Sequence, residues 1–168
     1  MASVGIFGGN PNEIAIVILR LCQDKGQNPG IDYYKITENN MIPIVSIDEN
    51  HMQAPKVWIL QETTNYAFLI DKDINEDRYL IVDTDNPVEL FPPFPDWSVI
   101  TYGLNNKASV TASSIADGAM QVCIQRGFKS LGGSAYEPQE FKAACPSFIS
   151  PLSILGATAA CAVCDVLS

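Results

Sequence analysis

The sequence predicts a three-layer α/β fold, in which a mainly parallel sheet in the first half continues as an antiparallel meander and a helix closes the chain. Short, continuous apolar runs are typical of strands buried on both faces, and such runs lie at 3–7, 57–60 and 79–82. A longer apolar segment follows the first run and indicates a helix, so the first half has the order of a βαβ unit. Alternating runs separated by turn residues follow in the second half and indicate the meander.

The first predicted helix covers about 13–24, shortly after a glycine turn. Asn12 is expected to cap its start, and Lys25 with Gly26 to end it, because short polar side chains favour the cap and glycine favours the position after the last turn. The other elements expected in the first half are a strand at 31–35, an irregular polar segment at 37–54 that is apolar only at 42–45, and a short helix from Thr63 or Thr64 to Ile70.

The second half begins after a loop at 87–97 that carries four prolines. Asp117-Gly118 is a strong hairpin signal between two of the strands that follow. Pro151 marks the start of the closing helix, because proline is favoured in a first helical turn. The elements expected here are strands at 99–102, 109–114 and 120–125, a turn at Gly132-Gly133 before the segment 134–143, and the helix 151–166.

Composition restricts the class of protein. The chain has 168 residues and a hydrophobic fraction of 47%, which together favour a single globular domain over residues 1–168. Its net charge is -9. The negative charge argues against nucleic acid and against anionic membranes as partners, because both need clustered cations. No targeting segment is visible in the sequence, so we expect a cytoplasmic protein.

The five cysteines are an odd number without the spacing of a disulfide framework. Most of them lie within apolar runs, so we expect reduced thiols in the core. Cys161 and Cys164 form a lone CxxC near the end of the closing helix, whereas a zinc site needs a second pair of ligands and a redox CxxC usually opens a helix. Packing is therefore the favoured role of this pair.

The turn after the first strand has the layout of a phosphate-binding loop. Gly8, Gly9 and Asn10 lie between the strand and the helix, where bare backbone N–H groups would face a phosphate. The lysine and the serine or threonine of a working loop are missing. Pro11 removes one N–H group, and Glu13 adds a negative charge near the expected phosphate. The loop therefore predicts at most vestigial cofactor binding.

Five segments stand in an order that one protein family shares. They are GIFGGN at 5–10, ILQETTNYA at 59–67, LIVD at 80–83, YGLNNKASVTA at 102–112 and the apolar helix at 152–166. Their counterparts in the family are G-I-T-G-T-N, an E-V-S-S-H-A stretch, a buried strand with an Asn, Y-G-x-x-x-A-D-V-x-A and N-x-x-N-x-x-A-A-x-A-x-A. On these segments the chain resembles the central, ATP-binding domain of the Mur ligases, which join amino acids to UDP-N-acetylmuramyl peptides.

The departures from this family concern its chemistry. The family's G-K-T is Pro11-Asn12-Glu13 here, so no lysine is present to draw charge from a γ-phosphate. No segment corresponds to the carbamylated-lysine region or to the domain that binds the incoming amino acid. The resemblance therefore implies a non-catalytic relative without a cofactor, which binds a protein partner, a second copy of itself or a small ligand. The alternative is an enzyme or nucleotide sensor that binds Mg-ATP or a UDP-sugar weakly through Gly8 to Asn10.

Carboxylates at the ends of predicted strands are the candidate metal ligands. The resemblance implies a magnesium role for Glu62, and Asp83 follows the next buried strand. Strand ends are where α/β sheets place their sites, and Asp85 lies close to Asp83 in sequence. The other interpretation is that these carboxylates are solvated and close their strands.

Overall fold

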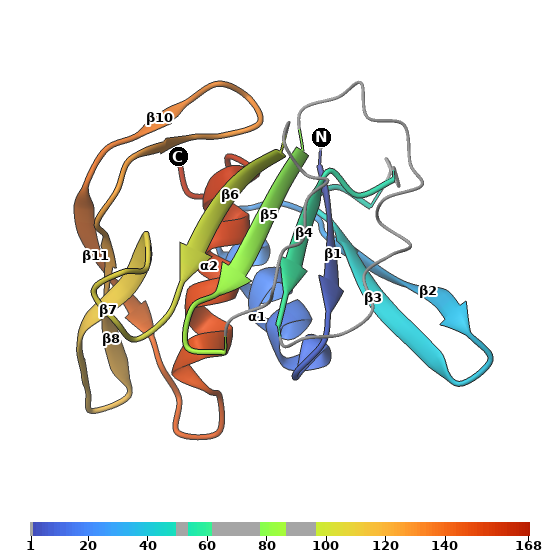
Figure 1. Cartoon of the computed structure of the whole chain (residues 1–168), viewed down its shortest axis with the longest axis horizontal. Coiled ribbons are helices and arrows are strands. Elements are labelled where there is room, and N and C mark those ends of the chain that lie inside the picture. Colours follow the sequence, from blue (N-terminus) through green and yellow to red (C-terminus); the bar gives the residue numbers. More distant parts are fainter. Residues whose placement is uncertain (1, 50–53, 62–77, 87–96) are drawn as a thin grey trace.

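A computed structural model describes residues 2–49, 54–61, 78–86 and 97–168 of the chain. The helices are α1 (Pro11–Asp24) and α2 (Pro151–Val163). The strands are β1 (Ser3–Phe7), β2 (Gly30–Thr37), β3 (Asn40–Ser46), β4 (Val57–Leu60), β5 (Arg78–Asp83), β6 (Trp97–Tyr102), β7 (Val110–Ala116), β8 (Ala119–Ile124), β9 (Phe128–Lys129), β10 (Ala135–Tyr136) and β11 (Gln139–Ala144). Nine of these strands form one sheet in the order β11-β8-β7-β6-β5-β4-β1-β3-β2, and β9 pairs with β10 separately (Figure 1).

The centre of the sheet is parallel, as the continuous apolar runs predict. β1, β4, β5 and β6 lie side by side and run in the same direction. Every residue of β1 and β4 is buried. Such strands need apolar side chains on both faces, which is why their sequences do not alternate. The mixed α/β class predicted from the sequence is thereby confirmed.

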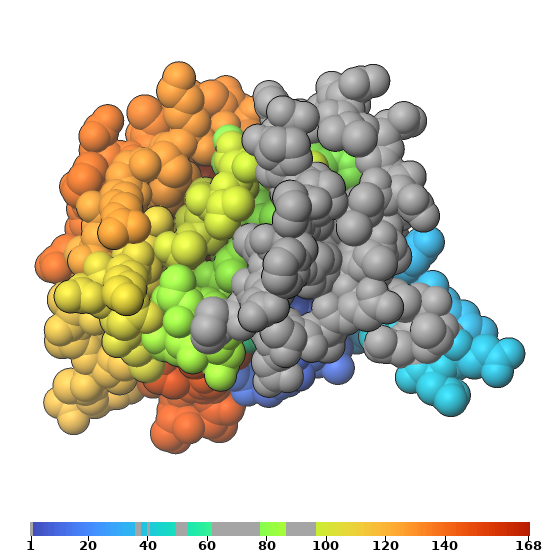
Figure 2. All heavy atoms as spheres, in the orientation of Figure 1, coloured from blue at the N-terminus to red at the C-terminus, as the bar shows by residue number. Residues whose placement is uncertain are grey.

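The prediction for 37–54 was wrong in part, because β3 occupies much of the stretch expected to be irregular. β3 pairs antiparallel with β1 on one side and with β2 on the other, so the first half of the chain is not purely parallel. Proline lacks the N–H group that a central strand needs. Pro43 is tolerated because β3 pairs with β1 only from Ile44 to Ser46. The outer end of the β2–β3 hairpin projects from the molecule (Figure 2).

The antiparallel meander forms only in part, because β6, which was expected to be its first strand, pairs in parallel with β5 and β7. The antiparallel part begins with β7, which pairs with β8. Asp117 and Gly118 connect β7 to β8 with φ angles of 52° and 74°, the left-handed conformations that a two-residue hairpin turn requires. β11 adds to β8 as an antiparallel edge strand. The segment 134–143, which the sequence presents as one unit, divides between β10 and β11.

Both helices of the described chain lie on one face of the sheet, behind it in the view of Figure 1. α1 starts at Pro11 with Asn10 at the cap position, so the prediction of Asn12 as the cap was wrong by two residues. Gly156 in α2 lies against the fully buried ring of Tyr102, where a Cβ atom would be 3.1 Å from Tyr102 Cζ. The absence of a side chain at this position thus lets α2 approach β6.

A second apolar cluster, which includes Phe7, Trp58 and Leu80, lies on the other face of the sheet. The predicted helix that starts at Thr63 or Thr64, and the proline-rich loop as far as residue 96, lie outside the described residues. The third layer of the predicted architecture therefore stays a prediction. No helix in the described part of the chain is both long enough and apolar enough to cross a membrane.

Candidate functional site

The carboxyl ends of the parallel strands meet at one edge of the sheet, which is the lower edge in Figure 1. Polar residues follow each of these strands directly: Gly8-Gly9-Asn10 after β1, Gln61 after β4, Thr84-Asp85-Asn86 after β5 and Gly103-Leu104-Asn105 after β6. Open α/β sheets bind their ligands at this edge. The predicted loop Gly8–Asn10 and the predicted ligand Asp83 are therefore both placed there.

The glycine loop lies between β1 and α1, as the sequence predicts, but one of its N–H groups is already bonded. Gly8 and Gly9 have φ angles of 83° and 59°, which favour glycine. The N–H group of Asn10 donates to Oε1 of Gln61 at 3.1 Å. A Cβ atom at Gly9 would be 2.5 Å from the same Gln61 oxygen. The amide of Gln61 therefore packs closely against the loop.

Glu13 joins the starts of the two helices. Its Oε1 accepts the N–H group of Ser150 at 2.9 Å, and its Oε2 accepts Nδ2 of Asn10 at 3.2 Å. Ser150 is the cap residue of α2, and Glu13 lies in the first turn of α1. A carboxylate is stabilised there by the free N–H groups at a helix start. The negative charge expected to repel phosphate thus has a structural role of its own.

The predicted metal ligand Asp83 forms a local turn. Its side chain is 2% exposed, and its carboxylate accepts the N–H groups of Asp85 at 2.8 Å and Asn86 at 3.3 Å. Nδ2 of Asn86 adds a third bond at 3.0 Å. Glu62 lies outside the described residues, and no group of three or more potential metal ligands occurs within them. The Glu62–Asp83 pair therefore stays a prediction.

Asp85 connects the loop after β5 to the loop after β6. It accepts the N–H group of Leu104 at 2.7 Å and a bond from Nδ2 of Asn105. Nδ2 of Asn105 also donates to Oγ1 of Thr84 at 2.8 Å. These bonds use the polar side chains of the two loops to hold the edge of the sheet in one shape.

Tyr102 lies fully buried under the same edge. Burial raises the pKa of its hydroxyl well above the usual value, and the nearby carboxylate of Asp83 adds to the effect. The phenol is therefore held in its neutral form over the physiological range of pH.

The cysteines are all free thiols, as expected. Cys161 is fully buried in α2, and Cys164 is the residue at which that helix ends. Burial raises the pKa of Cys164 well above the ordinary thiol value. Both groups are thus poor nucleophiles, because the thiolate is the reactive form.

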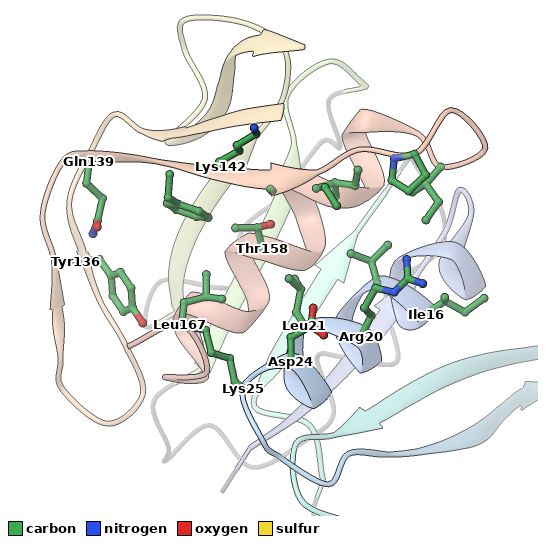
Figure 3. Close-up of a pocket in the computed structure, with 17 residues that line it drawn as sticks. Ile16, Arg20, Leu21, Asp24, Lys25, Tyr136, Gln139, Lys142, Thr158 and Leu167 are labelled. Carbon is green, nitrogen blue, oxygen red and sulfur yellow. The ribbon is translucent and has the colours of Figure 1, made fainter. Parts of the chain in front are cut away.

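A groove that sequence reasoning missed lies on the helix-covered side of the sheet. It has a volume of about 460 Å³ and opens between α1, α2 and β11 (Figure 3). Its wall is mostly apolar, and its charged lining residues are Arg20, Asp24, Lys25 and Lys142. We call it the α1–α2–β11 groove. The exposed Ile16 in the middle of an otherwise amphipathic helix was the one local signal for it.

A scan against protein-family models found none that matches the chain, and a search of curated proteins found no sequence with significant similarity. The class of protein is therefore defined by the structure alone. It is a mixed α/β domain with a parallel centre, two helices on one face in its described part, and a polar edge held together by its own side chains.

Proposed function

We propose that the chain is a non-catalytic binding domain of the Mur-ligase-like type, which holds a small ligand or a protein and does not turn over ATP. The single observation that carries the proposal is the hydrogen bond from the N–H group of Asn10 to Oε1 of Gln61. A phosphate-binding loop works through free N–H groups at a helix start. Here the loop donates one of them to a neighbouring side chain.

The charge at the helix start supports the same proposal. Glu13 occupies the first turn of α1 and accepts hydrogen bonds from Asn10 and Ser150. Bringing a triphosphate to this place would set a polyanion beside a carboxylate that the fold already uses. The repulsion would act on every phosphate-containing ligand, since it depends on charge and not on the base or sugar.

One observation favours the alternative of weak ATP or UDP-sugar binding. Gly8 and Gly9 keep the left-handed conformations of a loop that can wrap a phosphate. In this alternative the Gln61 amide would have to move away from Asn10 when the nucleotide binds. The two functions therefore differ in a property that can be measured directly.

The test is a thermal unfolding series with millimolar Mg-ATP and, separately, a UDP-sugar. A ligand at a hundred times its dissociation constant stabilises the folded state by about 2.7 kcal/mol. We expect no change in Tm with either ligand. A saturable increase that becomes larger in Glu13→Gln would place the nucleotide at the loop, because removal of the charge should help an anion there, and would overturn the proposal.

A further inference from the structure

The size of the α1–α2–β11 groove suits a small organic ligand. Its volume of about 460 Å³ falls within the range of roughly 300–1,000 Å³ that is usual for such sites. Apolar side chains from three elements line it, among them Leu21 of α1, Phe141 of β11 and Ile154 of α2. Ile16 at its margin is 60% exposed. An apolar ligand body would therefore remove hydrophobic surface from water on several sides at once.

A buried hydroxyl in the wall of the groove has no partner. Thr158 lines the groove from α2 and is 2% exposed, and its Oγ1 makes no hydrogen bond within the described structure. Figure 3 shows Thr158 on α2, between the strand that carries Lys142 and the helix that carries Arg20. Buried hydroxyls are nearly always bonded, because leaving one unpaired costs free energy. An oxygen on a ligand would supply the missing partner.

The rim of the groove is positively charged in a strongly negative protein. Arg20 and Lys25 on α1 line it, with Asp24 as the one acidic residue among its lining residues. Lys142 on β11 also lines the groove, but its ammonium group points away from α1 and α2 in Figure 3. Neither Arg20 nor Lys25 has an ion pair with any residue that the structure describes. The whole chain has only ten basic residues against nineteen acidic ones. A ligand with a negative head is thus the one that complements this rim.

We propose that the α1–α2–β11 groove binds a small amphipathic carboxylate, with its apolar body against α1 and α2, its carboxylate at the basic rim and a hydroxyl or keto oxygen of the body bonded to Thr158. The inference deepens the binding role proposed above and rests on it only for the idea that the chain acts by holding a ligand. The groove does not include the glycine loop, so nucleotide binding at the loop and carboxylate binding at the groove are separate results.

The first experiment measures the head group. Displacement of the fluorescent anion anilinonaphthalene sulfonate reports binding of decanoate, decan-1-ol and decyltrimethylammonium to the whole chain. We expect decanoate to bind about tenfold more tightly than decan-1-ol, since two exposed ion pairs each contribute up to about fivefold. The cationic amphiphile should bind least. Equal affinity for all three would overturn the proposal.

A charge-reversal variant with a matched control locates the head. Arg20→Glu with Lys25→Glu should abolish the preference for decanoate over decan-1-ol. Arg126→Glu with Lys107→Glu makes the same change in net charge at exposed residues outside the groove and should keep the preference. A loss of the preference in both double variants would assign it to the field of the whole molecule and would overturn the proposed site.

Thr158→Val tests the deep contact without changing the shape of the side chain. We expect a hydroxydecanoate to bind the natural chain about fivefold more tightly than decanoate does, and Thr158→Val to remove that difference. The variant should also have a higher Tm without ligand, because it deletes the unpaired hydroxyl. Equal affinity of the natural chain for the two acids, or a difference retained in Thr158→Val, would overturn the role of Thr158. Light scattering on the same samples tests whether a second copy of the chain occupies the groove. A doubled mass that returns to the monomer value when decanoate is added would identify the second copy as the occupant, and would overturn the proposal that the groove serves to bind a carboxylate.

Discussion

Glu13 can be interpreted in two ways, as a sign that the phosphate site is lost and as a residue that joins the two helices. The sequence presents it as a negative charge near the expected phosphate, at the position of the threonine in the family's G-K-T. In the structure its carboxylate bonds the cap residue of α2, which is 137 positions away in sequence. The same side chain also accepts Nδ2 of Asn10 beside the glycine loop. These hydrogen bonds give Glu13 a structural role that is independent of phosphate binding.

A lysine introduced at residue 13 should not create a phosphate site. Glu13→Lys removes both hydrogen bonds and places a cation in a first helical turn, so we expect a loss of about 1–2 kcal/mol in the free energy of unfolding. Glu13→Gln keeps the acceptor for Ser150 and should lose less than about 0.5 kcal/mol. Urea unfolding of the two variants measures this difference. Mg-ATP should not change the stability of Glu13→Lys. A saturable stabilisation of that variant would contradict the claim that the glycine loop does not bind phosphate.

Among the elements, β1 and β4 show how a glycine can serve strand pairing. Gly5 lies opposite Trp58 in the parallel pair. A Cβ atom at Gly5 would overlap three carbons of the Trp58 ring, which is 2% exposed. The tryptophan therefore covers the glycine on the face of the sheet opposite the two helices. The resemblance to the Mur ligases includes this glycine, and here a packing reason accounts for it.

Gly5→Ala should destabilise the fold through this contact. We expect a loss of about 2–3 kcal/mol, since a buried ring between strands has little room to move. In a Trp58→Leu background the same change should cost less than about 1 kcal/mol, because the overlapping atoms are gone. Chemical unfolding of the four proteins of this double-mutant cycle gives the coupling. Additive effects would show that the alanine acts through the strand backbone and not through the ring.

The stability of the whole molecule should depend on pH at the alkaline end, because a buried phenol stays neutral in the folded state. Burial raises the pKa of Tyr102 well above the usual value of 10.0, with the carboxylate of Asp83 adding to the shift. Above that pH the unfolded chain loses the phenolic proton while the folded chain keeps it. The unfolded state then binds fewer protons, so the free energy of unfolding falls as the pH rises. Below about pH 10 this contribution is fully present.

Two tyrosine variants test whether Tyr102 causes the fall in stability at high pH, which we call the alkaline limb of the stability profile. We expect the stability of the natural chain to fall between about pH 10 and 11 by up to about 1.4 kcal/mol per pH unit for this group. Tyr102→Phe should make this limb shallower. Tyr33→Phe, at a side chain that is 47% exposed, is the matched control and should leave the limb unchanged. Identical limbs in all three proteins would show that other groups carry the alkaline dependence.

Local patterns were sufficient to predict the parallel centre, the Asp117-Gly118 hairpin and both described helices, because burial on both faces and turn chemistry leave a signal in neighbouring residues. β3 was missed because Pro43 interrupts its apolar run, and its place in the sheet depends on how far β1 extends beside it. The glycine loop and Asp83 were correctly located at the strand ends, while the bond between Asn10 and Gln61 was not foreseen. The two residues are 51 positions apart in sequence, and they meet because they follow β1 and β4, which are neighbours in the sheet.

The residues alone thus established the class of fold and the lack of a lysine at the first helix. Only the folded structure shows the contact of Glu13 with Ser150 and brings Arg20, Phe141 and Thr158 together around one groove. The physical reason is distance along the chain. Burial periodicity and turn propensity act between near neighbours and can be read from them, whereas a groove or a cap shared by two helices exists only once α1, α2 and β11 have packed together.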